Sequence, residues 1–117
     1  MNKEELLDFF ISLFPGFEKA WKSEGNVFCE NDNFTSHGVC AEFSHYFKDN
    51  FESFSDENLK SLFQQIEEIV TGDAKNENET TNALYTCFLE NIAQTEAGNS
   101  SEKYLGKKSR EYFNHWN

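Results

Sequence analysis

The sequence predicts an all-α domain, and three observations support that prediction. Apolar residues recur at helical spacing in several segments, and no stretch of useful length alternates apolar and polar residues as a strand would. Aromatic residues make up 16% of the chain, which provides ample area for a packed core. With 117 residues the chain has the size of one domain, so we expect a single domain over residues 1–117. We expect it to be a compact bundle of about five to six helices.

The predicted central helix covers residues 80–93. Residues 80–89 carry no charge, although acidic residues are dense in the rest of the chain. Apolar residues cover two neighbouring helical stripes, with Leu84, Cys87, Phe88 and Ile92 on one and Tyr85 and Leu89 on the other. A helix that is apolar on more than one face is normally buried on more than one face, so we expect the bundle to form around this segment.

The first half of the chain predicts three helices and one loop. Asn2 and Glu5 have the spacing of a capping box, and the helix that they begin ends before Pro15. A short helix follows, with Phe17, Ala20 and Trp21 on its buried side. Residues 25–35 are polar and rich in Asn and Asp, which is typical of a loop. We expect this loop to be held against the core by Val27, Phe28 and Phe34, and to be followed by a helix over residues 36–50.

The second half begins with the clearest helical pattern in the chain. Ser55 is a favourable N-cap, and apolar residues then recur at helical spacing as far as Val70. Gly72 follows this stripe, where we expect it to end the helix in a left-handed conformation. Residues 94–101 are polar and predict a loop, and a last amphipathic helix is expected over residues 105–116.

The charge balance limits the partners that the protein can have. The chain has 21 acidic and 10 basic residues, for a formal net charge of -11. Such a charge repels nucleic acid and anionic membranes, so we expect neither as a direct partner. It attracts a protein with a basic surface through long-range electrostatic steering. The alternative is that the negative charge only keeps the protein soluble.

Three features of the sequence predict where in the cell the protein is located. The first ten residues contain acids where a secretory signal needs a basic region. No apolar run approaches the ~20 residues that a membrane-spanning helix needs. The three cysteines are an odd number, and reduced thiols are the simplest explanation. We therefore expect a cytoplasmic protein.

The candidate catalytic and metal-binding residues do not match a known pattern. Cys29, His37, Cys40 and His45 lie near one another in the sequence, but no Cys-x-x-Cys pair is present and the spacings fit no zinc site. An enzyme would have to use Cys29, His37, His45 or Glu42 in a pocket, and nothing in the sequence activates them. We therefore expect no enzymatic activity, no metal and no cofactor.

Two further groups of charged residues have expected structural roles. Glu42 and Glu90 lie within apolar runs and are the carboxylates most expected to be buried, with Arg110, Lys108 or a helix N-terminus as the expected partner. The C-terminal basic residues Lys103, Lys107, Lys108 and Arg110 are expected to neutralise an acidic face of the same molecule.

The remaining acidic residues predict a partner interface. Nine lie between positions 49 and 79, where only Lys60 and Lys75 offset them, and two more lie in the predicted loop over residues 25–35. The predicted interface residues are Glu30, Asp32, Asp49, Glu52, Asp56, Glu57, Glu67, Glu68, Asp73, Glu77 and Glu79. The alternative is that these residues lie on ordinary solvated helix faces, which the spacing alone favours slightly.

Three stretches carry a resemblance to a known group of proteins. They are HGVCAEFSHYF at residues 37–47, TCFLENIA at residues 86–93, and YLGKKSREYFNHW at residues 104–116. Together they resemble small acidic helical bacterial proteins that are similar to immunity proteins of contact-dependent growth inhibition and polymorphic toxin systems. The resemblance implies a protein that neutralises a toxin by binding it, and it implies no catalytic residues.

These observations lead to one expected function and one alternative. We expect an immunity protein that covers the basic active-site cleft of a cognate toxin's C-terminal domain, with a nuclease, and specifically an RNase, as the best candidate. The alternative is a non-enzymatic cytoplasmic helical adaptor or regulatory binding module. A partner that binds through an apolar patch, insensitively to salt, would favour the adaptor.

Overall fold

The prediction of an all-α fold is confirmed by a computed structural model of the chain, which describes residues 1–73, 75 and 78–117. No strand occurs within these residues, and the Cα radius of gyration is 13.2 Å. The elements are α1 (Lys3–Leu13), α2 (Gly16–Trp21), α3 (Ser36–Asn50), the 3-10 turn η1 (Phe51–Ser53), α4 (Asp56–Gly72), α5 (Glu79–Ala83), the π-helix η2 (Leu84–Leu89), α6 (Glu90–Ile92), α7 (Glu96–Ser101), the 3-10 turn η3 (Glu102–Tyr104) and α8 (Lys107–Trp116). With α5, η2 and α6 counted as one continuous helix, the described residues form seven helices, one more than expected.

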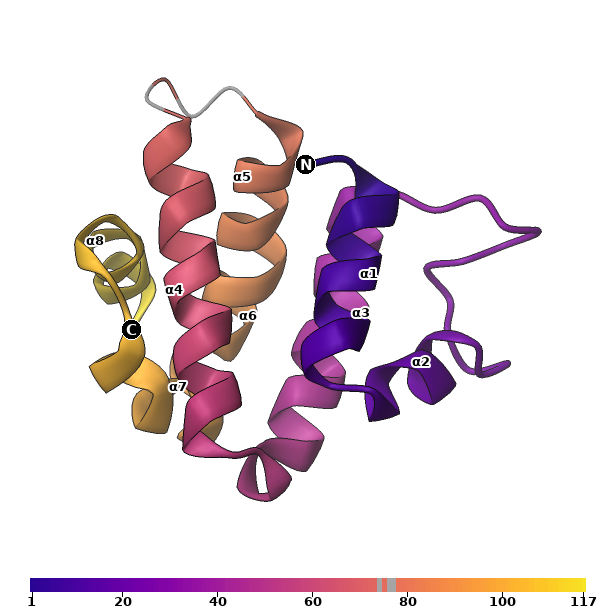
Figure 1. Cartoon of the computed structure of the whole chain (residues 1–117), viewed down its shortest axis with the longest axis horizontal. Helices are drawn as coiled ribbons and strands as arrows, with labels where there is room; N and C mark the ends of the chain where they lie inside the picture. The colour runs from indigo at the N-terminus through magenta and orange to yellow at the C-terminus, as the bar shows by residue number, and fades with distance from the viewer. Residues whose placement is uncertain (74, 76–77) are drawn as a thin grey trace.

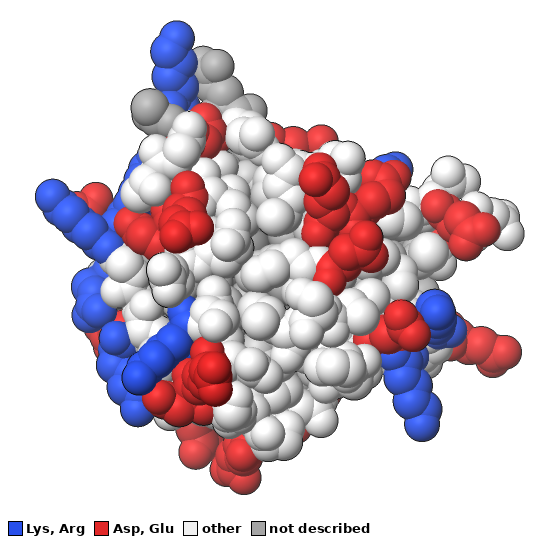
Figure 2. Space-filling view, in the orientation of Figure 1, with Lys and Arg blue, Asp and Glu red and all other residues white. Residues whose placement is uncertain are grey.

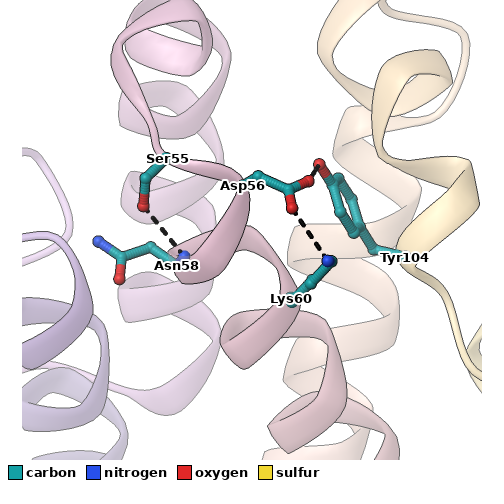
Figure 3. Close-up of polar contacts among 5 residues, drawn as sticks. All are labelled: Ser55, Asp56, Asn58, Lys60 and Tyr104. Atoms are coloured by element: carbon teal, nitrogen blue, oxygen red, sulfur yellow. Dashed lines mark hydrogen bonds and ion pairs between the residues drawn. The ribbon is translucent and has the colours of Figure 1, made fainter.

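The predicted helix starts are confirmed by their hydrogen bonds. At α1, the Glu5 amide donates to Asn2 Oδ1 at 2.8 Å and the Asn2 amide donates to Glu5 Oε1 at 3.0 Å, which completes the capping box. At α4, the Asn58 amide donates to Ser55 Oγ at 3.1 Å (Figure 3). These caps satisfy amide groups that have no partner within their own helices.

The continuous helix from α5 to α6 lies at the centre of the bundle, between α4 and the pair formed by α1 and α3 (Figure 1). Its middle part is π-helical, and the Glu90 amide donates to the Tyr85 carbonyl five residues earlier. Both predicted stripes contribute buried residues, which are Leu84, Tyr85, Phe88, Leu89 and Ile92. Cys87 differs from this prediction because it is only half-buried and lines a surface hollow.

The core is dominated by stacked and edge-on phenylalanine rings. The Phe10 and Phe43 rings are stacked with their centroids 4.0 Å apart, which joins α1 to α3. Phe88 of η2 contacts Phe43 at 5.4 Å and Phe47 at 5.2 Å, and Phe63 of α4 lies 6.1 Å from Phe88. Such aromatic pairs contribute about 0.5–1.5 kcal/mol each beyond the area that they bury.

The predicted loop over residues 94–101 is wrong, because α7 forms within it. Thr95 caps this helix by accepting the Gly98 amide at 3.1 Å. A Cβ atom on Gly98 would lie 1.9 Å from the Ile92 carbonyl oxygen, so glycine is required for the close approach of α7 to α6. The helix forms despite its weak intrinsic propensity because its cap and this contact outweigh that propensity.

The predicted left-handed cap at Gly72 is also wrong. Gly72 is the last residue of α4, and no described glycine has a positive φ angle. The end of α4 is capped from α8, where Lys108 Nζ donates to the carbonyls of Val70 at 2.9 Å and Asp73 at 3.2 Å. A basic side chain from another helix therefore satisfies carbonyls that a glycine cap would otherwise have satisfied.

The loop after α2 is anchored by two of the three predicted residues. Phe28 and Phe34 pack against the core, whereas Val27 is 82% exposed. The tip is a tight turn in which Asn31 and Asp32 have φ angles of 51° and 63°, a conformation that Asn and Asp tolerate better than most residues. Hydrogen bonds between the main chains of Glu30 and Asn33, at 2.9 and 3.1 Å, close this turn.

No helix in the described ranges is long and apolar enough to cross a membrane.

Candidate partner-binding surface

The predicted acidic residues form separate groups, not one continuous patch. Asp49, Glu52, Asp56 and Glu57 lie where α3 passes through η1 into α4, whereas Asp73 and Glu79 lie beyond the other end of α4. Because α4 has 17 residues, these two groups lie about 25 Å apart along the helix. Figure 2 shows that on one face groups of Asp and Glu are divided by uncharged surface, with many of the visible Lys and Arg side chains along the left edge and others at the lower right.

The other predicted interface residues are also dispersed. Glu30 and Asp32 are exposed on the loop after α2. Glu57 and Glu68 are exposed on α4, and Glu79 is exposed in the first turn of α5. Asp73 is half-buried and accepts the Asn78 amide at 2.7 Å. Glu77 lies outside the residues that the structure describes.

One group surrounds a hollow on the surface. Asp49, Glu52 and Glu96 of α7 all line this hollow, and all three residues are exposed. The hollow has a volume of about 470 Å³, and Phe51 contributes an apolar wall to it. We call Asp49, Glu52, Asp56 and Glu96 the acidic end. Glu96 is not among the predicted interface residues, and it lies in the stretch over residues 94–101 that was predicted to be a loop.

A second hollow, of about 410 Å³, continues from the first. It shares Phe51, Glu52 and Ser100 with its neighbour and adds Asp56 and Tyr104. Lys48 lines the first hollow and Lys103 the second, so the four carboxylates of the acidic end exceed the basic residues beside them. The result is a groove with aromatic walls and a predominantly negative rim.

Asp56 is held in a defined orientation by two neighbours (Figure 3). Tyr104 donates its hydroxyl hydrogen bond to Asp56 Oδ1, and Lys60 Nζ lies 3.0 Å from Asp56 Oδ2. The hydrogen bonds from Tyr104 and Lys60 hold the pKa of Asp56 below its ordinary value, and the same bond to Asp56 raises the pKa of Tyr104. Asp56 is therefore ionised at neutral pH, but Lys60 offsets part of its charge.

Glu67 has a different role from the one predicted, because it caps α8 instead of facing solvent. Its carboxylate accepts the amides of Lys108 at 3.0 Å and Ser109 at 2.9 Å, and the Ser109 hydroxyl at 2.6 Å. Burial raises the pKa of Glu67, but these bonds from Ser109 and Lys108 outweigh it and lower the pKa below its ordinary value. The N-cap residue Gly106 has no side chain to make these bonds, so α4 supplies the cap.

The expected pairing of these carboxylates with Arg110 or Lys108 is wrong. Glu90 is half-buried and lies 3.4 Å from the Tyr112 hydroxyl, whereas Arg110 donates to the Leu105 carbonyl and Lys108 to the end of α4. Glu42 is also half-buried. Burial raises the pKa of Glu42 above its ordinary value, and the nearby His45 offsets only part of this effect. Two of the C-terminal basic residues lie near acidic residues, as expected. Lys108 lies near Glu67, and Lys103 lies near Asp56.

The candidate catalytic residues His37, Cys29 and Cys40 do not lie in one site. His37 lines a hollow with Cys87, and its Nε2 atom lies 2.8 Å from Asn82 Oδ1. Cys29 lines another hollow beneath the loop, and Cys40 is fully buried, which raises the pKa of its thiol well above the ordinary value. No group of three or more His, Cys, Asp or Glu residues suited to a metal ion occurs in the part of the chain that the structure describes.

Comparison with known proteins gives one match. No curated protein and no solved structure matches the chain. A protein-family profile described as "Domain of unknown function (DUF7674)" matches residues 7–117, which is nearly the whole sequence. The chain therefore belongs to the DUF7674 family of domains.

Proposed function

We propose that this protein is a cytoplasmic, non-enzymatic immunity protein that binds and neutralises a cognate bacterial toxin domain with a basic surface. The observation that carries the proposal is the acidic end, where Asp49, Glu52 and Glu96 surround a hollow beside Phe51. The net charge of -11 supports it, because the field of the whole molecule attracts a basic partner.

The acidic end combines the two features that a tight interface needs. Its carboxylates increase the association rate with a basic protein and orient it, with rate constants that rise well above the usual ~10⁵–10⁶ M⁻¹s⁻¹ at low salt. The half-buried Phe51 offers apolar contact beside those charges, and aromatic residues are enriched at the centres of interfaces. A nuclease cleft, and specifically that of an RNase, is the best candidate target because it is basic in order to bind phosphates.

The experiment that tests this proposal uses the native gene neighbourhood. The C-terminal region of the adjacent large protein is expressed in cells with and without this chain, and growth and RNA integrity are followed. We expect the toxin domain alone to stop growth and degrade RNA. Coexpression of this chain is expected to restore both, and the two proteins are expected to copurify.

Two variants serve as controls in the same cells. A variant with Asp49, Glu52 and Glu96 changed to Lys is expected to rescue growth less well. A control variant, in which three exposed acidic residues away from the acidic end are changed to Lys, is expected to rescue growth normally. Toxicity without rescue by the unchanged chain would contradict the proposal. If the toxin domain alone stops growth but leaves the RNA intact, and this chain restores growth, the result would support the immunity function and exclude an RNase as the target.

A second candidate function is a helical adaptor that binds its partner mainly through apolar contact. The exposed apolar residues Val27, at 82%, and Trp116, at 42%, favour this alternative. Binding by such an adaptor would depend little on salt, and a Trp116→Ala or Val27→Ser variant would weaken it more than charge reversal at the acidic end.

A further inference from the structure

The hollow that Cys29 lines lies between α1, α2 and the loop over residues 22–35, and it has the features of a binding groove. Its volume is about 610 Å³. The apolar lining comes from Leu7 and Ile11, which lie one turn apart on α1, together with Trp21 and Phe34. The Trp21 and Phe34 rings meet edge to face with their centroids 5.3 Å apart. Leu7, Ile11 and Phe34 are each only half-buried, so the chain itself does not cover this apolar lining completely.

The rim of this groove is negatively charged. Three carboxylates line it, which are those of Asp8, Glu18 and Asp32, and all three residues are exposed. Lys22, also in the lining, lies 3.5 Å from Glu18. Between described residues, Asp8 and Asp32 form no ion pair within 4.0 Å.

Asp32 is held in place by the turn at the tip of the loop. Its φ angle is 63°, and the main-chain bonds between Glu30 and Asn33 close the turn around it. Phe34 already binds one cation within the protein, because Lys3 Nζ lies 5.0 Å from the centroid of its ring and donates to its carbonyl at 3.1 Å. An aromatic ring of the lining is therefore compatible with an adjacent cationic group.

We propose that this groove is a docking site for a segment of a partner protein that carries an arginine next to an aliphatic side chain. The aliphatic side chain fits the apolar lining, and the guanidinium lies between the carboxylates of Asp8 and Asp32. Arginine is preferred to lysine because its planar group bonds carboxylates in a bidentate manner and stacks on aromatic rings. A purely apolar segment would desolvate the rim carboxylates without pairing them.

Two other occupants fit the charge less well. A second copy of this chain also carries a net charge of -11, so the two copies repel each other at this acidic rim. A polyanion is repelled for the same reason. The inference goes beyond the inhibitor proposal, since it concerns a different surface and requires no toxin.

The experiment titrates a defined probe into the full chain labelled with ¹⁵N. The probe is the peptide acetyl-Leu-Arg-Leu-amide, and its matched control has citrulline in place of arginine, which keeps the shape and removes the charge. We expect the arginine peptide to shift the resonances of Ile11, Asp32 and the Trp21 indole. We expect the citrulline peptide to bind roughly fivefold more weakly, as the loss of an ion pair of about 1 kcal/mol predicts.

A pair of variants tests the role of the rim. The Asp8→Asn, Asp32→Asn variant removes two rim charges, and Asn tolerates the left-handed conformation at position 32. The Glu4→Gln, Glu24→Gln variant removes two exposed charges that do not line the groove. We expect the first variant to lose the preference for arginine and the second to retain it.

Three results would overturn the inference. They are equal binding of the two peptides, shifts that cluster away from the groove, and no shifts up to the solubility limit of the arginine peptide. Because the assay contains no toxin, failure of the immunity proposal leaves these outcomes unchanged, and failure here leaves the rescue experiment unchanged.

Discussion

Individual carboxylates of this acidic protein differ sharply in what surrounds them. Asp56 accepts a hydrogen bond from Tyr104 and pairs with Lys60, whereas Glu67 accepts three hydrogen bonds from the start of α8. Asp49 and Glu52 are exposed beside a hollow. Asp56 and Glu67 are therefore engaged by other groups of the protein, although Asp56 remains exposed at the acidic end, whereas Asp49 and Glu52 face solvent beside the hollow.

Replacing Tyr104 with Phe tests the hydrogen bond to Asp56. The change removes the donor that contributes most to the lowered pKa of Asp56, so we expect that pKa to rise towards its ordinary value, with Lys60 still holding it slightly lower. The measurement is a pH titration of the carboxyl carbon resonance by NMR. Tyr112→Phe is the control, because Tyr112 lies against Glu90 and not Asp56. An Asp56 pKa that does not move in the Tyr104 variant would show that the bond is absent in solution.

Replacing Glu67 with Gln tests the cap on α8. The amide keeps the shape of the side chain but loses the charge, and we expect the free energy of unfolding at neutral pH to fall by about 1–2 kcal/mol. The control is Glu68→Gln, the exposed neighbour, which should change stability by less than about 0.5 kcal/mol. Denaturant unfolding followed by circular dichroism measures both, and equal effects of the two variants would exclude the cap.

The Glu67 cap also predicts a pH dependence. The pKa of Glu67 is lower in the folded protein than its ordinary value, so its contribution is complete above the unfolded pKa and is lost as the pH falls through the folded pKa. We therefore expect the stability difference between wild type and Glu67→Gln to be constant near neutral pH and to shrink below about pH 4. A difference that grows on acidification would contradict this assignment.

At the scale of elements, α4 and α8 cap each other. The last turn of α4 contains no basic residue and the first turn of α8 contains no acidic residue. Lys108 supplies the missing base to α4, and Glu67 supplies the missing acid to α8. Each helix thus satisfies the free backbone groups and the terminal partial charge of the other.

Glycine substitutions distinguish a packed helix contact from an open helix end. In Gly98→Ala the new Cβ would meet the Ile92 carbonyl oxygen at 1.9 Å, and because this atom is backbone, we expect a loss of roughly 1–3 kcal/mol. In Gly72→Ala no described atom outside its chain neighbours and its own helix backbone lies within 4 Å of the new Cβ, and we expect a gain of up to about 1 kcal/mol from helix propensity. Thermal and denaturant unfolding of both variants measure this contrast. A neutral Gly98→Ala variant would mean that α7 does not approach α6 so closely.

At the scale of the whole molecule, the excess negative charge is largely not neutralised within the protein. Between described residues, two ion pairs lie within 4.0 Å, Lys22 with Glu18 and Lys60 with Asp56. The net charge of -11 therefore produces a field that extends into solvent and weakens with added salt. The location of the charges decides which surface a basic partner meets first.

Charge reversal tests whether the acidic end directs association. One variant changes Asp49, Glu52 and Glu96 to Lys, and its control changes the exposed Glu24, Glu68 and Glu111 to Lys. Because each reversal adds two positive charges, both variants carry a net charge of -5 instead of -11. With the toxin domain as partner, we expect the first variant to associate more than tenfold more slowly and with a weaker salt dependence, and the control to be affected less. Stopped-flow association at several salt concentrations measures this, and equal effects would remove the acidic end from the interface.

The sequence by itself determined the helical class and the features that depend on near neighbours. The capping box of α1, the Ser55 cap and the apolar stripe of α4 involve residues a few positions apart, so their outcome follows from local geometry. The central position of residues 80–93 was also predictable, because an uncharged segment with two apolar stripes has no other place in an acidic protein.

Only the tertiary structure decided which acidic residues stay available and which are used within the molecule. Glu67 and Lys108 lie 41 positions apart, and Glu96 lines the same hollow as Asp49 and Glu52 only because α7 forms where the sequence predicts a loop. The π-helical turn of η2 and the half-exposed Cys87 likewise depend on packing against α3 and α8. These features depend on contacts between distant segments, and periodicity along the chain carries no information about how those segments pack.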